Sequence, residues 1–202
     1  MAKSFIGALQ SLTMPTLELI QAMVLIVLYE MGHGIYPAAS MSIAACARAA
    51  RSIGLKKRQA DTGLEDQVLI ELRKRLWWAI FVLDRSISLF TGDKIFAADD
   101  PQPTDTLPIE LDAWENDVYA EAPNINLSTP SNIRVGPFAR ECQAAHLIGR
   151  VVRHVFDPAT DATFQKEEAV QLEQTLNAFL PLLMEQETHF GLFCAAMGLC
   201  SK

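Results

Sequence analysis

Two adjacent charged residues stand out because they interrupt an apolar stretch. Asp84 and Arg85 follow the run Leu76–Leu83, and apolar residues resume after them. Neither has an opposite charge three or four positions away, and neighbouring residues on a helix do not face each other. A buried unpaired charge is costly, so each would need a partner from another part of the chain. Arg48 and Arg51 are candidate partners for Asp84. An internal ligand is the alternative, and a structural pairing is favoured.

A second polar group lies on a predicted helix over residues 138–156. His146, Arg150 and Arg153 fall on one side of it, opposite an apolar stripe. This arrangement could bind an anion, but a solvated polar face is the more common explanation and is favoured.

Two basic clusters are separated by a short stretch of chain. They are Lys56-Lys57-Arg58 and Arg73-Lys74-Arg75. One interpretation is a nuclear-import signal or a patch that faces acidic groups. The other is ordinary helix and loop charge, with Glu71 pairing with Arg75 one turn later. The second interpretation is favoured because the later cluster lies inside a predicted helix.

The familiar catalytic and metal-binding motifs are missing from the sequence. It contains no HExxH, GxSxG, GxGxxG or P-loop pattern. Glu185 and His189 are spaced to meet on a helix, but a metal site needs more ligands, so a surface contact is favoured. The four cysteines form no CxxC pair and are predicted to be free and mostly buried thiols. They are Cys46, Cys142, Cys194 and Cys200.

Composition narrows the class of protein further. The chain has 202 residues, is 50% apolar and carries a net charge of -7. These values predict a globular protein with its own core and argue against direct DNA binding, which needs clustered positive charge. The longest uninterrupted apolar run, 22–29, is too short to span a membrane, and the N-terminus is a poor signal peptide. We therefore expect an intracellular protein without membrane contact.

Apolar periodicity predicts an all-α fold with a central helix at about 64–91. Apolar residues at 69, 72, 76, 80, 83, 87 and 90 form one stripe on that helix. A capping box over 62–65 would open it and Gly92 would close it. Trp77 and Trp78 lie about 100° apart on it, so it should be packed on several sides. Two helices are predicted before it, one from Thr13–Pro15 to about Met31 and one from Ala38 to Ile53, with Gly54 as a left-handed cap.

Three helices are predicted towards the C-terminus. The first covers 138–156. The second runs from Asp161 or Thr163 to about Phe179, where Pro181 breaks or kinks it, and the third covers 190–199.

The segment 93–135 differs from the rest of the chain. It contains five of the ten prolines, and between Asp93 and Ile133 there are nine acidic residues and one basic residue, Lys94. A connection of this length is either functional or loosely ordered. One short helix is predicted within it, over 109–119.

The central helix resembles the signature of the fungal-specific transcription factor domain, the regulatory middle region of fungal zinc-cluster activators. That family has two basic residues, Leu-Trp-Trp, an apolar stretch, Asp-Arg and then a glycine. The preceding helix is similar to its "A-x-R-x-A … L-G-L" pattern, and a Leu-Pro follows. The matching positions, within about 17–108, are Arg48, Gly54, Lys74, Arg75, Leu76, Trp77, Trp78, Asp84, Arg85, Gly92, Leu107 and Pro108.

The resemblance implies an irregular antiparallel array of helices acting as one regulatory domain over 1–202, with C-terminal helices over 136–202. It implies a protein that regulates transcription in the nucleus, with the cytoplasm as the alternative location. The expected contacts are with the DNA-binding domain of the same factor, with another protein or with a small-molecule effector. A homodimer is also possible on this resemblance. Family members bind zinc through six cysteines, which this chain's four cannot supply, so no cofactor is expected in it. A stand-alone binding protein is the alternative function, and a small enzyme is a weaker one.

Overall fold

The computed structural model describes residues 14–56, 67–116, 123–156 and 161–187, with side chains described as far as residue 182. Within these ranges every regular element is a helix, and the only bridge pairing joins Thr106 and Asn126. The predicted all-α fold is confirmed. The helices are α2 (Leu17–Gly32), α3 (Tyr36–Ser52), α4 (Gln67–Thr91), α5 (Leu111–Glu115), α6 (Pro137–Phe156) and α7 (Ala162–Glu187).

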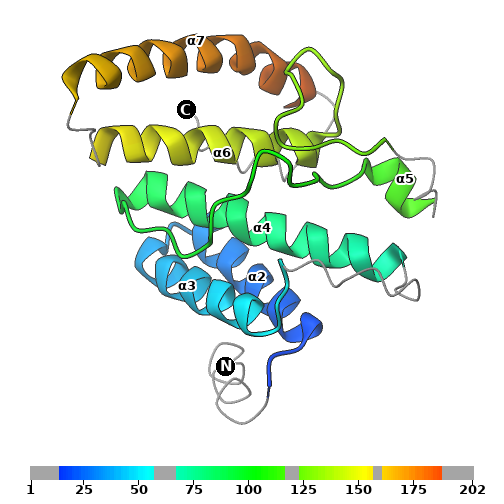
Figure 1. The fold of residues 1–202 in the computed structure, drawn as a ribbon. Coiled ribbons are helices and arrows are strands. Elements are labelled where there is room, and N and C mark those ends of the chain that lie inside the picture. The colour runs from blue at the N-terminus through cyan, green and yellow to red at the C-terminus, as the bar shows by residue number, and fades with distance from the viewer. Residues whose placement is uncertain (1–13, 57–66, 117–122, 157–160, 188–202) are drawn as a thin grey trace.

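The helix α4 lies in the middle of the fold, with α2 and α3 on one side and α6 and then α7 on the other (Figure 1). Its predicted stripe is confirmed: Leu76, Ile80, Leu83 and Ile87 are buried in a core shared with α2 and α3. The opposite side of α4 contributes Trp78, Phe81 and Val82 to a second core with α6 and the segment that connects the two helices. The predicted start of this helix and its capping box lie outside the described residues.

The first two helices begin and end close to the predicted positions. Thr16 caps α2 by accepting a hydrogen bond from the Leu19 N–H, so Pro15 precedes the helix and is not in its first turn. After α3, Gly54 has a φ of 62° and the buried Leu55 follows it, which confirms the predicted left-handed cap. Gly92, with a φ of 68°, ends α4 in the same way.

The last described helix runs further than predicted. Asp161 accepts a hydrogen bond from the Thr163 N–H at 2.8 Å and so caps α7. Pro181 lies inside this helix, which continues to Glu187, so of the two predicted outcomes, a break or a kink, the break is wrong. The proline ring removes the donor to the carbonyl of Asn177, and that residue is exposed, where water can satisfy the carbonyl. The predicted helix over 190–199 lies outside the described residues.

Neighbouring helices do not all run in opposite directions. Tyr36 at the start of α3 stacks on Phe90 near the end of α4, so these two helices are antiparallel. In contrast, α4 and α6 run in the same direction (Figure 1). The 93–135 connection makes this possible because it returns along α4 before α6 begins. Within it the short helix α5 covers less than the predicted 109–119.

The first half of the connection pairs with its second half. The Leu107 N–H donates to the Ile125 carbonyl at 2.8 Å, and the Leu127 N–H donates to the Asp105 carbonyl at 3.0 Å. Leu107 and Leu127 are both buried in the second core. The described parts of the connection are therefore packed on α4 and α6. No helix in the described ranges has the length and apolarity needed to cross a membrane.

Candidate functional site

The buried charges of α4 bind the beginning of the connection. The Asp84 carboxylate accepts hydrogen bonds from the N–H groups of Ala97 and Ala98, at 3.0 and 3.1 Å. It also pairs with Arg85. Burial raises the pKa of Asp84, and the Arg85 charge and the two N–H groups oppose that shift. The site therefore joins a helix to the backbone of a segment more than ten residues away.

Neither of the two arginines predicted to pair with Asp84 does so. Arg48 makes no ion pair with it, and Arg51 instead binds Asp99 and the Ala97 carbonyl. Arg85, expected to face away from Asp84, pairs with it because the long arginine side chain can fold back along the helix. The prediction that each charge needs support from elsewhere in the chain is confirmed.

Arg85 is fully buried between two aromatic rings. Its guanidinium lies 4.4 Å from the centroid of Phe81 and 3.8 Å from that of Phe96. It donates to the Ala98 carbonyl at 3.1 Å and to Asp100 at 2.9 Å. Burial lowers the pKa of Arg85, and Asp84 and Asp100 oppose this shift, so the residue remains a buried cation.

The helix α6 leaves space for Arg85 at one position. A Cβ atom on Gly149 would lie 3.0 Å from Arg85 Nε and 3.1 Å from its Cδ. Those distances are too short for ordinary packing, and both side-chain atoms belong to a residue held on every side. The glycine is therefore required by the close approach of α6 to the buried arginine.

Replacing Gly149 with Ala should therefore destabilise the protein, although alanine is the better helix former. We expect the free energy of unfolding to fall by about 1–3 kcal/mol, the usual cost of overpacking a core. Urea unfolding of the variant measures this. Gly32→Ala is a matched control, since a Cβ there meets nothing within 4 Å. An unchanged or raised stability for Gly149→Ala would contradict the packing described.

Asp100 links this site to α6. Its carboxylate binds both Arg85 and Arg153, and Arg153 also lies 5.0 Å from the Phe96 ring. Burial alone would raise the pKa of Asp100, but its hydrogen bonds to the two arginines hold that pKa below the usual value. Burial and the charge of Arg150 lower the pKa of His146. The predicted solvated face therefore describes Arg153 only in part, because its side chain is 43% exposed but also binds the acidic connection.

Two further points of attachment lie towards the start of α4. The Trp78 indole N–H donates to the Thr106 carbonyl at 2.9 Å. Glu71 accepts from the Ile109 N–H at 2.9 Å, and Arg75 donates to the Ile109 carbonyl at 2.7 Å. The predicted Glu71–Arg75 pair is confirmed at 3.2 Å. We call these three attachments, at residues 97–100, 106 and 109, the α4 clamp.

The helix α6 holds the second half of the connection in a similar way. The buried Arg140 donates to the Ile133 carbonyl at 2.8 Å and to Gln143 at 2.9 Å. Gln143 in turn donates to the carbonyls of Leu127 and Thr129. No motif in the sequence pointed to these residues. In the sequence, Arg140 and Gln143 look like polar residues of a solvent-exposed helix, and only the structure shows that both are buried.

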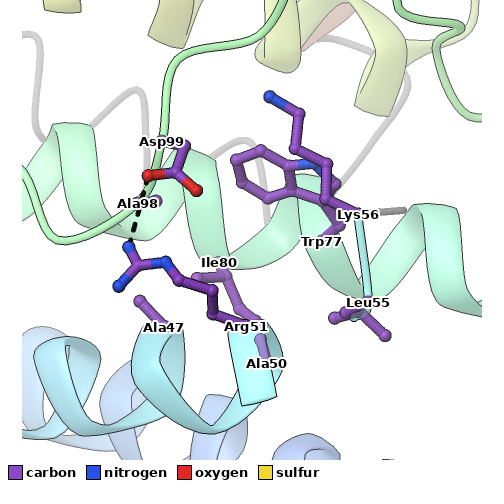
Figure 2. A pocket seen from close by; sticks show the side chains of 9 residues that line it. All are labelled: Ala47, Ala50, Arg51, Leu55, Lys56, Trp77, Ile80, Ala98 and Asp99. Carbon is purple, nitrogen blue, oxygen red and sulfur yellow. Dashed lines mark hydrogen bonds and ion pairs between the residues drawn. The ribbon is translucent and has the colours of Figure 1, made fainter. Parts of the chain in front are cut away.

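A small hollow opens beside Trp77, between α3, α4 and the connection (Figure 2). Arg51 and Lys56 lie on two sides of it, and Lys56 Nζ is 4.9 Å from the Trp77 ring. Both cations are occupied, since Arg51 binds Asp99 and Lys56 donates to the Asp100 carbonyl at 2.6 Å. The cavity volume is about 40 Å³, far below that of a typical ligand site.

The remaining signature residues are distributed through the fold. Arg48 is exposed on α3, whereas Leu76, Leu107 and Pro108 are buried. The cations of the second basic cluster bind neighbours: Arg73 the Gly54 carbonyl, and Lys74 the carboxylate of Glu71. Lys57, Arg58, the Glu185 side chain and His189 lie outside the described residues.

The described residues do not fit a zinc cluster. Cys46 and Cys142 are free and buried on different helices, as predicted for the thiols, while Cys194 and Cys200 lie outside the described ranges. Burial raises the pKa of Cys46 to about 12 and that of Cys142 well above its ordinary value, which disfavours the thiolate that metal binding needs. Across the described ranges, no three His, Cys, Asp or Glu side chains gather at one point.

Sequence comparison finds fungal transcription factors among the relatives of this chain. ABC-transporter-regulating transcription factors of Aspergillus oryzae and Aspergillus fumigatus are each 36% identical over 92 residues, which is 45% of this chain and 10% of theirs. Transcription factor BOA15 of Botryotinia fuckeliana is 37% identical over 59 residues, 29% of this chain and 33% of that protein. The chain thus spans about a tenth of the first two relatives. No solved structure matches it. The fungal specific transcription factor domain matches residues 2–178, which is most of the chain, and the protein therefore belongs to that family.

Proposed function

We propose that this chain is a regulatory module that controls a fungal transcription factor through protein contacts and does not itself read DNA. The observation that carries the proposal is the family match over residues 2–178. The net charge of -7 supports the second part, because it opposes binding to the phosphate backbone. On this proposal the family's zinc cluster and DNA recognition belong to a segment outside this chain or to a partner protein, in the nucleus.

The α4 clamp suggests how such a module works. It holds an acidic segment in a single position against the central helix, with every attachment made by a charged or aromatic side chain of α4. A module of this kind presents a defined acidic surface to a partner instead of a reaction centre. We therefore propose a binding function and not an enzymatic one, with residues 93–135 as part of the contact surface.

A reporter assay tests the proposal. The full chain is fused between a heterologous DNA-binding domain and an activation domain, and transcription from the matching promoter is measured in a fungal host. The proposal predicts that the chain alters the output of the fusion. It also predicts that the purified chain does not retard a DNA fragment at physiological salt. Reporter output equal to that of a fusion carrying an unrelated helical protein of similar length, or retardation of DNA by the chain alone, would contradict it.

A further inference from the structure

The outward face of α2 lacks the charged residues that the exposed face of a helix normally carries. The helix has two charged side chains, Glu18 in its first turn and Glu30, which is buried. Its inward face packs against α3 and α4, and the buried residues that form this face are Ile20, Met23, Val24, Val27, Glu30 and Met31. A helix at the surface of a globular protein usually has polar residues opposite its buried side. The composition of α2 is therefore that of a helix covered on both sides.

The residues opposite the buried side follow the spacing of a coiled coil. Successive residues turn by about 100° around an α-helix, which places Glu18, Ala22, Leu25, Tyr29 and Gly32 on the side away from the core. Their steps of four, three, four and three are those of the contact positions of a coiled coil. Leu25 is 65% exposed and Tyr29 is 61% exposed. We call these five residues the outer α2 stripe.

A second copy of this chain fits the outer α2 stripe because the stripe is complementary to itself. In an antiparallel pair of α2 helices, the contact layers join position 25 to position 29 of the other copy, and position 22 to position 32. The large side chains of Leu25 and Tyr29 then meet in the two central layers. The small residues Ala22 and Gly32 meet in the outer layers, where they allow the helices to approach closely. A two-fold axis repeats each of these contacts, as it does in most homodimers.

The single charge of the stripe determines the direction of pairing. Glu18 is exposed at the start of α2. A parallel pair would bring the two Glu18 carboxylates together, where they repel, whereas an antiparallel pair places them far apart along the contact. We propose that two copies of this chain associate through their outer α2 stripes in antiparallel orientation, with Leu25 and Tyr29 at the centre. The proposal does not rest on the proposed regulatory function.

The association is expected to be weak and to strengthen with salt. The 16 residues of α2 give a contact only about 24 Å long, and interfaces below about 1,200 Å² are typical of weak and transient complexes. Each copy carries a net charge of -7, so two copies repel each other. Salt screens this repulsion, and the apolar layers of the contact contain no ion pair that salt would weaken.

Sedimentation velocity on the purified full chain tests the proposal. Between about 1 μM and 1 mM the chain should shift from monomer to dimer, with a Kd in the micromolar range or weaker. Raising NaCl from about 50 to 500 mM should lower the Kd. A monomer at every concentration would overturn the proposal in favour of residues 1–13 or a different protein as the occupant of the stripe. A Kd that rises with salt would also overturn it, because ion pairs elsewhere on the surface would then hold the copies together.

Variants locate the contact and its direction. Leu25→Glu should raise the Kd about tenfold or more, while Val170→Glu, which places the same charge at an exposed apolar position on α7, should leave it unchanged. Leu25→Lys and Tyr29→Glu should each weaken association alone, and an equimolar mixture of the two should recover it, because position 25 meets position 29 of the other copy. Thermal melts check that each variant is folded. Undiminished association of folded Leu25→Glu, or no recovery in the mixture, would overturn the assignment.

Discussion

Replacement of Arg85 by Met is expected to lower the free energy of unfolding by about 3–5 kcal/mol, the usual cost of breaking a buried ion pair by removing one partner. Arg85 is fully buried, and its loss leaves the Asp84 carboxylate in the core without its charge partner. The two N–H groups that Asp84 accepts from remain, but they do not carry a full charge. Urea unfolding followed by circular dichroism measures the change.

Two controls separate charge pairing from general damage. Arg153→Met removes the other arginine bound to Asp100, and because its side chain is 43% exposed the cost should stay below about 1 kcal/mol. Adding Asp84→Asn to Arg85→Met removes the unpaired charge, so the double variant should be more stable than Arg85→Met alone. A double variant less stable than Arg85→Met would show that the buried charge is not the cause.

Replacement of Trp78 by Ala is the second change with a large expected effect. The ring is 3% exposed, packs in the second core and donates a hydrogen bond to the Thr106 carbonyl. Truncation of a buried Trp costs about 3–5 kcal/mol. Trp77 is only partly buried, so Trp77→Ala should cost less by at least about 1 kcal/mol. Thermal and urea unfolding of the two variants measure the difference.

The comparison between the two tryptophans is informative because the rings are neighbours. Their centroids are 6.2 Å apart and both contact Phe81 edge-on. Any general effect of losing an aromatic ring in this region would appear in both variants. Equal losses of stability would contradict the assignment of Trp78 to the core and of Trp77 to its margin.

The central helix could be predicted from the sequence because its stripe and its closing glycine are local signals. The direction of α6 relative to α4 could not, since it depends on the path of the long connection between them. Pro181 shows a similar limit. A proline usually ends a helix, but where the affected carbonyl is exposed, water can replace the lost hydrogen bond.

The candidate site was predictable only in part. The interruption of an apolar run marked Asp84 and Arg85 as buried charges that need support. Their support comes mainly from backbone groups at Ala97 and Ala98 and from Asp100. Backbone donors leave no trace in the sequence, and Asp100 is one of nine acidic residues in its segment. Gly149 was equally hidden, because only the approach of α6 to Arg85 gives it a role.

The signature of α4 acquires a physical meaning from these contacts. Its residues Arg75, Trp78, Asp84 and Arg85 hold the connection at successive points along one helix. We therefore regard the α4 clamp as the central feature of the domain.

Hydrogen–deuterium exchange of the backbone amides tests the clamp most directly. In the unmodified chain the N–H groups of Ala97, Ala98 and Ile109 should be protected. Asp84→Asn should speed exchange at 97–98 and leave Ile109 protected, because Glu71 still holds it, and Glu71→Gln should do the reverse. Rapid exchange at all three positions in the unmodified chain, or identical changes in the two variants, would contradict the account.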